Sequence, residues 1–235
     1  MNEMTLVKRI TRNVEGMLSD REGRFLYDAA KSCRGKGVIL EIGSFKGKST
    51  IWLARGSQSG SGVKVYCVDP FIETNNYRRS KGEISLLAAF SKNISDAGVS
   101  DTVVPFVGTS AERAKDWDRP IELLWIDGDH SYEMVRLDFE LWSPHLVEGG
   151  IIAFHNTLWT AGPRRVLRES IYGSRYFKDI GLVGKITYAR KTSRGTLAGA
   201  ISSVYALSIS NVCGWAVGRK LPRPLKRLGR KLIGL

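Results

Sequence analysis

Acidic side chains stand at the ends of two apolar runs in the first third of the sequence. Glu41 lies next to the end of the run 38–42, and Asp69 follows the run 63–68. Gly43 opens a turn after the first run, and a helical stretch follows it. Because parallel strands end at one edge of a sheet, we expect the two carboxylates to flank this turn. Such a pair suits a ligand with a positive end and a ribose end, and S-adenosylmethionine (SAM) is such a ligand.

The sequence of the glycine stretch 43–49 is also similar to two better-known nucleotide-binding loops. It is one residue shorter than a Walker A loop, which would remove one amide from the phosphate cradle. The run 123–127 is compatible with a Walker B strand, so a P-loop ATP- or GTP-binding protein remains an alternative of another class. The dinucleotide fingerprint fails because Phe45 stands at its second glycine. A third reading is that Gly43 and Gly47 only allow a tight turn.

A second group of polar side chains follows the apolar run 121–126. Asp127 comes directly after this run, where it would face a ligand, and His130 lies one helical turn further on. A neutral imidazole can take a proton from a substrate hydroxyl near neutral pH. We therefore predict His130 and Asp127 as catalytic residues. Asp129 or Ser131 would cap the helix that starts beside them, a role that is compatible with catalysis.

A third group, His155 and Asn156, follows the buried run 150–154. Together with Asp127, these residues would offer oxygen and nitrogen ligands to a divalent cation such as Mg²⁺. Mg²⁺ prefers several carboxylates, however, so simple substrate contacts are an equal alternative. The spacing shows no two-histidine, one-carboxylate set of the kind that binds iron. His145 follows a helix end and is interpreted as structural.

The elements that position these residues alternate along the chain. Apolar runs alternate with helical stretches, which predicts an α/β fold with a doubly wound, mostly parallel seven-stranded sheet. Strands are predicted at 37–42, 63–68, 102–107, 121–126 and 150–154, with a final antiparallel hairpin at 177–183 and 185–190. Helices are predicted near 47–56, 83–97, 110–116, 131–142 and 163–172. Residues 3–33 read as two helices that break around Ser19 and Asp20, the first with an apolar face that extends to Leu18.

The composition is that of a soluble globular protein. Of the 235 residues, 43% are hydrophobic and 25% are charged. The three cysteines are scattered and have no metal-binding spacing, so we interpret them as reduced thiols in a cytoplasmic protein. The first 20 residues lack the uninterrupted apolar core of a secretory signal.

The net charge of +13 is concentrated at the C-terminal end. Seven basic residues and no acidic one fall in the last 17 positions, namely Arg219, Lys220, Arg223, Lys226, Arg227, Arg230 and Lys231. This segment lacks aromatic residues after Trp215, so no nucleic-acid partner is inferred. The preceding stretch 196–218 has no charged side chain but several serines. It favours a helix at an anionic membrane surface, and packing on the core, a homodimer contact and a true span are the alternatives.

Several of these segments together resemble class I SAM-dependent methyltransferases, with the greatest likeness to the macrolide-sugar O-methyltransferase-like subgroup and a more distant one to catechol-type enzymes. The resemblance extends over residues 36–191, between a helical cap (1–35) and an apolar, then basic tail (192–235). The motifs that carry it are Glu41-Ile42-Gly43 with Gly47 and Thr50, Val68-Asp69-Pro70, residues 126–132, Asp138, Gly149-Gly150 and Phe154-His155-Asn156.

The resemblance implies roles for individual residues. Glu41 and Gly43 would line the methionine end of SAM, Asp69 would hold the ribose hydroxyls, and Ser110 would contact the adenine. Ser44, Gly47 and Ser49 complete the implied cofactor-binding set. Asp127 would be a metal ligand or a cofactor contact, and His130 the general base. At 155–156 the chain departs from metal-dependent relatives, which tend to have an acidic residue there.

The sequence thus predicts a SAM-dependent O-methyltransferase that acts on a hydroxyl, with a sugar in a glycoside or lipid-linked glycan as the favoured acceptor. A soluble aromatic or secondary-metabolite hydroxyl is the alternative acceptor. The polar loop 70–82, which follows the Asp69 strand end, is a candidate lid over the acceptor. The tail would hold the enzyme peripherally at the cytoplasmic membrane face.

Overall fold

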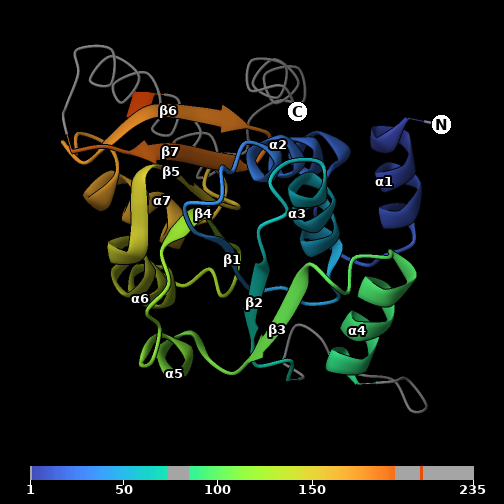
Figure 1. Ribbon diagram of the computed structural model, residues 1–235. Coiled ribbons are helices and arrows are strands. Elements are labelled where there is room, and N and C mark those ends of the chain that lie inside the picture. The colour runs from blue at the N-terminus through green and yellow to red at the C-terminus, as the bar shows by residue number, and fades with distance from the viewer. Residues whose placement is uncertain (1, 73–84, 194–206, 209–235) are drawn as a thin grey trace, which may run out of the picture. The chain divides into compact units, whose positions relative to one another are not determined.

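The computed structural model describes residues 2–72, 85–193 and 207–208 (Figure 1). The first half contains α1 (Glu3–Arg12), α2 (Asp20–Lys31), β1 (Val38–Ile42), α3 (Lys48–Gln58), β2 (Val65–Asp69), α4 (Leu86–Asp96), β3 (Val103–Val107) and α5 (Ser110–Ala114). The second half contains β4 (Ile121–Ile126), α6 (Tyr132–Trp142), the short 3₁₀ helix η1 (Ser143–His145), β5 (Leu146–Phe154), α7 (Ala161–Ser170), β6 (Phe177–Val183) and β7 (Ile186–Lys191).

The strands form one seven-stranded sheet in the order β3-β2-β1-β4-β5-β7-β6. β2 pairs in parallel with both β1 and β3, whereas β7 pairs antiparallel with both β5 and β6. Every residue of β4 is buried, as expected for a strand that is covered on both faces. The predicted fold class, a doubly wound and mostly parallel seven-stranded α/β sheet, is confirmed.

The chain divides into two compact units, Met1–Leu123 and Leu124–Leu235, and each is described by itself. In the first unit, α2 and α3 lie side by side (Figure 1) because glycines let them approach closely. A Cβ atom at Gly23 would lie 2.3 Å from the Trp52 ring, and one at Gly56 would lie 2.3 Å from the Tyr27 carbonyl oxygen. The buried Trp52 side chain therefore fills the space that a larger residue at position 23 would need.

The N-terminal helices agree only in part with the sequence pattern. Ser19 caps α2 as predicted, in a reciprocal capping box with Glu22. The first helix, however, ends at Arg12 rather than near Leu18. Gly16 adopts a φ of 153°, which a glycine tolerates, and Met17 is 77% exposed instead of buried on a helical face.

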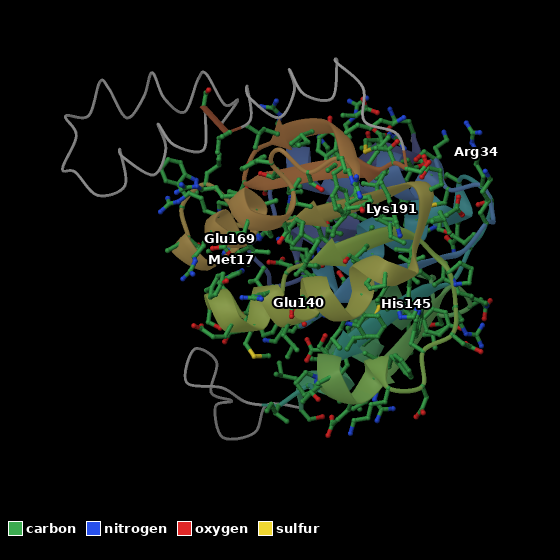
Figure 2. All side chains as sticks on the ribbon, turned by 90° about the vertical axis from the view of Figure 1, so that its left-hand side faces the viewer. Met17, Arg34, Glu140, His145, Glu169 and Lys191 are labelled. Carbon is green, nitrogen blue, oxygen red and sulfur yellow. The ribbon has the colours of Figure 1, made fainter. Side chains whose placement is uncertain are left out.

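In the second unit, the predicted C-terminal hairpin is confirmed as β6 and β7. The fifth strand begins at Leu146, earlier than predicted, and its first half includes Gly149 at a φ of 77°. Lys191 at the end of β7 donates to the carbonyl oxygens of Ser143, Pro144 and Leu146 at 3.3, 3.2 and 2.6 Å. It thereby satisfies carbonyl groups beyond the end of α6, and its burial lowers its pKa. Lys191 and His145 are labelled in Figure 2.

Two predicted segments lie largely outside the described residues. These are the candidate lid at 70–82, described only as far as residue 72, and the tail at 192–235, described only at 192–193 and 207–208. Among the helices that the structure does describe, none is long and apolar enough to cross a membrane.

Candidate functional site

The turn after β1 brings together the predicted cofactor-binding residues between positions 41 and 49. Gly43, Phe45 and Gly47 adopt positive φ values of 84°, 48° and 87°. Glycine accepts this conformation readily, whereas Phe45 is strained in it, and such strain occurs preferentially at ligand sites. Gly47 then stands at the N-cap of α3 without a side-chain capping bond.

Glu41 holds this turn from inside the protein. Its side chain is fully buried, and its carboxylate accepts hydrogen bonds from the hydroxyls of Ser44, Ser49 and Thr50. Burial raises the pKa of Glu41, while the three hydroxyls act in the opposite direction. Its lack of exposed surface favours a role in positioning the turn, and a direct contact with SAM stays a prediction.

Asp69 holds the same turn from the tip of β2. Its Oδ2 accepts the backbone N–H groups of Ser44 and Phe45, each at 2.9 Å, and its Oδ1 accepts the N–H of Phe71 at 2.6 Å. Ser44 thus donates its hydroxyl to Glu41 and its amide to Asp69. The two carboxylates therefore meet at one turn, as the sequence predicts. The half-buried Asp69 keeps acceptor capacity for further donors, since a carboxylate has about four lone-pair positions.

This geometry does not favour the P-loop alternative. The amides of Ser44 and Phe45, which would have to cradle a phosphate, point at the Asp69 carboxylate. Lys48, at the position of the Walker A lysine, donates to the carbonyl oxygen of Gly16 at 3.3 Å. A triphosphate would face negative charge in this turn instead of amides and an ammonium group.

Ser110 lies outside this turn. It begins α5 and is buried, while the preceding Thr109 caps the helix in a capping box with Glu112. The contact of Ser110 with an adenine ring stays a prediction.

The catalytic candidates of the second unit cluster around Asp127. Its Oδ1 lies 2.9 Å from Nδ1 of His155 and 3.4 Å from Nε2 of His130. His155 is 2% exposed, and its backbone N–H donates to the Ile126 carbonyl oxygen at 3.1 Å. His130 is 36% exposed. The buried His155 therefore orients Asp127, and His130 occupies the accessible side of the cluster.

Two neighbouring residues fix the position of His130. Asn156, at a positive φ of 53°, places its Nδ2 3.3 Å from Nε2 of His130. A Cβ atom at Gly162 in α7 would lie only 2.2 Å from the His130 carbonyl oxygen. Ser131 caps α6, and a hydrogen bond from its amide lowers the pKa of Asp129. The predicted capping role of this segment is confirmed.

The interaction between Asp127 and His155 was only partly anticipated. The sequence groups Asp127 with His155 and Asn156, but it shows no set of two histidines and one carboxylate. The structure assembles such a set from Asp127, His130 and His155, whose ligand atoms lie within 4.8 Å of one another. Spacing along the chain does not reveal this set, because its members meet across two strand ends. The only available signal was that β4 and β5 both end in polar residues.

Comparison with known proteins agrees with this fold. A family model described as a methyltransferase domain matches residues 40–157. A catechol O-methyltransferase from Mycobacterium tuberculosis (strain ATCC 25618 / H37Rv) is 29% identical over 155 residues, which cover 65% of this chain and 61% of that relative. The match thus spans less than two thirds of the relative.

Two solved structures illustrate the shared fold. The O-methyltransferase TomG from Streptomyces achromogenes, in complex with SAM, has a TM-score of 0.58 at 18% identity, covering 82% of this chain and 91% of TomG. The O-methyltransferase NovP has a TM-score of 0.65 at 14% identity, covering 81% of this chain and 88% of NovP. Because the domain model spans just over half of the sequence, the chain belongs to the methyltransferase-domain family of class I SAM-dependent methyltransferases.

Proposed function

We propose that this protein is an O-methyltransferase that moves the methyl group of SAM to a hydroxyl of its acceptor. The observation that carries the proposal is the turn at 43–47, held by Glu41 and Asp69 within a methyltransferase domain. Asp69 would accept the ribose hydroxyls, and the buried Glu41 would keep the turn in shape. The relative described as a catechol O-methyltransferase supports oxygen as the methyl acceptor.

An oxygen nucleophile needs a base, and His130 is suited to this role. An alcohol attacks the methyl carbon effectively only as its proton leaves. His130 would take that proton, the new C–O bond would form as the C–S bond breaks, and the bond electrons would stay on sulfur. Asp127, oriented by His155, would stabilise the imidazolium. Much of the remaining acceleration would come from holding oxygen, carbon and sulfur in line.

The donor set around Asp127 is a poor fit for Mg²⁺. One carboxylate and two imidazoles lie within 4.8 Å of one another, whereas Mg²⁺ prefers oxygen ligands in an octahedron. No step is therefore assigned to Mg²⁺ in this proposal.

For the acceptor, we propose a sugar hydroxyl, supported by an aromatic side chain near the catalytic cluster. Trp159 is 38% exposed and lies in the turn that the Thr160 amide closes on the Asn156 carbonyl oxygen at 3.1 Å. An exposed indole offers an apolar face with a polar tip, which suits stacking against a sugar ring. An aromatic or secondary-metabolite hydroxyl would stack there as well, and the name of the catechol relative favours that second candidate.

The cofactor part of the proposal can be tested by calorimetry. The full chain is titrated with S-adenosylhomocysteine and, separately, with Mg-ATP. We expect saturable binding of the first and none of the second. Asp69→Asn should weaken S-adenosylhomocysteine binding because an amide replaces the acceptor of two turn N–H groups. Asp101→Asn, at an exposed position after α4, is the matched control. Binding of Mg-ATP alone would reject the methyltransferase assignment.

The acceptor class requires a turnover assay. Transfer of a labelled methyl group from SAM is followed with glycosides and with catechol-like phenols. Trp159→Ala should raise the KM for glycosides while leaving the affinity for S-adenosylhomocysteine unchanged. Turnover of phenols but not glycosides would overturn the sugar assignment and leave O-methyl transfer intact.

We also propose that the tail 192–235 places the enzyme at the cytoplasmic face of an anionic membrane. The support is compositional, namely the uncharged stretch 196–218 followed by seven basic residues. A homodimer contact is the alternative use of the same segment.

A further inference from the structure

The turn that joins β5 to α7 holds an arginine side chain close to the catalytic cluster. In this 156–160 turn, the Thr160 amide donates to the Asn156 carbonyl oxygen at 3.1 Å. Arg164 lies in the first turn of α7, and its Nη1 donates to the Leu158 carbonyl oxygen at 3.4 Å. The guanidinium group of Arg164 therefore lies against the 156–160 turn.

Both ends of this turn meet the residue that is assigned to the acceptor proton. At one end, Asn156 places its Nδ2 3.3 Å from Nε2 of His130. At the other end, a Cβ atom at Gly162 would lie 2.2 Å from the His130 carbonyl oxygen. Trp159, which is 38% exposed, stands between them in the sequence. An acceptor whose hydroxyl reaches His130 would therefore lie close to the side chains that this turn exposes.

The 156–160 turn is anchored in the protein. The Thr157 side chain is buried, and its amide and hydroxyl both donate to the Lys185 carbonyl oxygen at 3.2 Å. The Thr157 hydroxyl also lies 2.7 Å from that of Thr187 in β7. Leu158 is fully buried. Groups that are held in place before a ligand arrives bind it with a smaller loss of entropy.

Most of the hydrogen-bonding capacity of Arg164 is unused. A guanidinium group has five N–H donors. In the part of the chain that the structure describes, the Arg164 side chain donates the single bond to Leu158 and forms no ion pair. The neighbouring Arg165 differs, because it donates to Glu169 at 2.8 Å and lies 3.8 Å from the centre of the Tyr132 ring (Glu169 is labelled in Figure 2). Arg164 is also half-buried, whereas Arg165 is exposed.

The stability of α7 does not explain an arginine at position 164. The first turn of a helix carries a partial positive charge, which favours acidic side chains there. α7 has no acidic residue in its first turn, and Thr160 at its N-cap makes no side-chain capping bond. Arg164 thus adds positive charge where the helix already has it. An anionic group on the acceptor would offset this charge.

We propose that Arg164 is an acceptor-binding residue, and that it selects acceptors with a carboxylate or phosphate group near the reacting hydroxyl. A guanidinium group binds either anion through two parallel hydrogen bonds, which fix the orientation of the acceptor as well as adding affinity. With Trp159 against the ring and His130 at the hydroxyl, this contact would align the acceptor at three points. The inference rests on the proposed function, because it concerns the acceptor of that same site.

The first test is binding to the full chain. Glucuronate, glucose phosphate and methyl glucoside are titrated by calorimetry, with and without S-adenosylhomocysteine. We expect at least one of the two anions to bind about tenfold more tightly than the neutral sugar, since hydrogen bonds to charged groups contribute about this much. The anion that binds more tightly distinguishes a carboxylate from a phosphate on the acceptor.

The second test is turnover with pairs of acceptors that differ in one charged group. Labelled methyl transfer from SAM is compared for the same sugars and for catechol against caffeate. Arg164→Gln should lower the ratio of kcat/KM for charged over neutral acceptors about tenfold. Arg164→Lys should retain part of the preference, because it keeps the charge and loses the planar fork. If Arg164→Gln does not fold, Arg164→Lys carries the test.

Arg168→Gln is the matched control. It removes the same charge from the same helix, at an exposed position about one helical turn further from the 156–160 turn. It should leave the binding and the kcat/KM ratio unchanged. If Arg164 only supports the turn through Leu158, its loss will slow charged and neutral acceptors equally.

Three outcomes would overturn the inference. These are a wild type that prefers the charged member of no pair, equal effects of Arg164→Gln on charged and neutral acceptors, and equal effects of Arg164→Gln and Arg168→Gln. Failure of the proposed function is distinguishable. It would appear as absent S-adenosylhomocysteine binding or absent turnover of every acceptor, while the anions still bind in a way that depends on Arg164.

Discussion

At the level of single residues, Glu41 combines complete burial with an ionisable group. Its pKa is raised above the ordinary value of 4.5, mainly because burial disfavours the charged carboxylate. The unfolded chain therefore releases this proton at a lower pH than the folded chain does. Between the two pKa values the folded state binds more protons, so the contribution of Glu41 to the free energy of unfolding falls as the pH rises.

Glu41→Gln should reveal this dependence, because a glutamine at position 41 does not titrate. The free energy of unfolding of the wild type minus that of the variant should decrease as the pH rises above about 4, where the window opens at the unfolded pKa. Urea unfolding at a series of pH values measures this difference. Glu148→Gln, at an exposed position in β5, is a control in which the difference should change less. A constant difference for Glu41→Gln would contradict the assigned pKa shift.

His130 is the residue for which the proposed chemistry makes the sharpest kinetic prediction. Removing a general base typically lowers turnover by about 10²–10⁴-fold. We expect His130→Ala to lower kcat within this range while S-adenosylhomocysteine affinity, measured by calorimetry, stays within about twofold of the wild type. His145→Ala should match the wild type in both measurements. A His130→Ala enzyme with unchanged kcat would show that another group takes the proton.

At the level of elements, the close approach of α7 to the catalytic segment is set by one glycine. Gly162→Ala would place a methyl group where the His130 carbonyl oxygen and the Ser131 carbonyl carbon lie, at 2.2 and 2.7 Å. The segment 130–132 must then shift, and such overpacking costs about 1–3 kcal/mol. We expect a lower melting temperature and a reduced kcat. Ala161→Ser, at the exposed neighbouring position, should change neither.

The sequence predicts elements better than it predicts contacts. Strands such as β4 are recognisable because their residues are continuously apolar, and α2 because Ser19 and Glu22 form a capping box. The sequence pattern does not show the end of α1, because apolar residues at helical spacing continue past Arg12. The helix itself ends at Arg12, and Gly16 beyond it adopts a φ of 153°. The local sequence pattern thus predicts which residues are buried and which cap a helix. It does not predict the residue at which α1 ends.

The candidate site shows the same division. Glu41 and Asp69 are recognisable in the sequence because each stands at a strand end. The structure adds that the hydroxyls of Ser44 and Ser49, which are predicted to bind the cofactor, donate hydrogen bonds to Glu41. The pairing of His155 with Asp127 depends on the adjacency of two strand ends, which no spacing encodes. The residue types thus indicate the chemistry of the site. Which side chains contact one another could be known only from the folded structure.

At the level of the whole molecule, the methyltransferase domain and much of the net positive charge occupy different parts of the sequence. The methyltransferase-domain model ends at residue 157, and seven of the basic residues that give the net charge of +13 fall in the last 17 positions. Near an anionic surface, each basic residue contributes about 1 kcal/mol of attraction, which salt screens. The tail is thus the part of the chain that would respond to a membrane.

The tail predicts a binding behaviour that the catalytic domain alone would lack. The full chain should co-sediment with phosphatidylglycerol vesicles and not with phosphatidylcholine vesicles, and salt should release it. Replacing the seven basic tail residues with glutamine should abolish binding while leaving S-adenosylhomocysteine affinity unchanged, because the residues assigned to the cofactor all precede position 128. If the tail serves dimerisation instead, the full chain will sediment as a dimer and ignore both vesicles. Equal binding to the two vesicle types would show that apolar insertion, and not charge, holds the protein at a membrane.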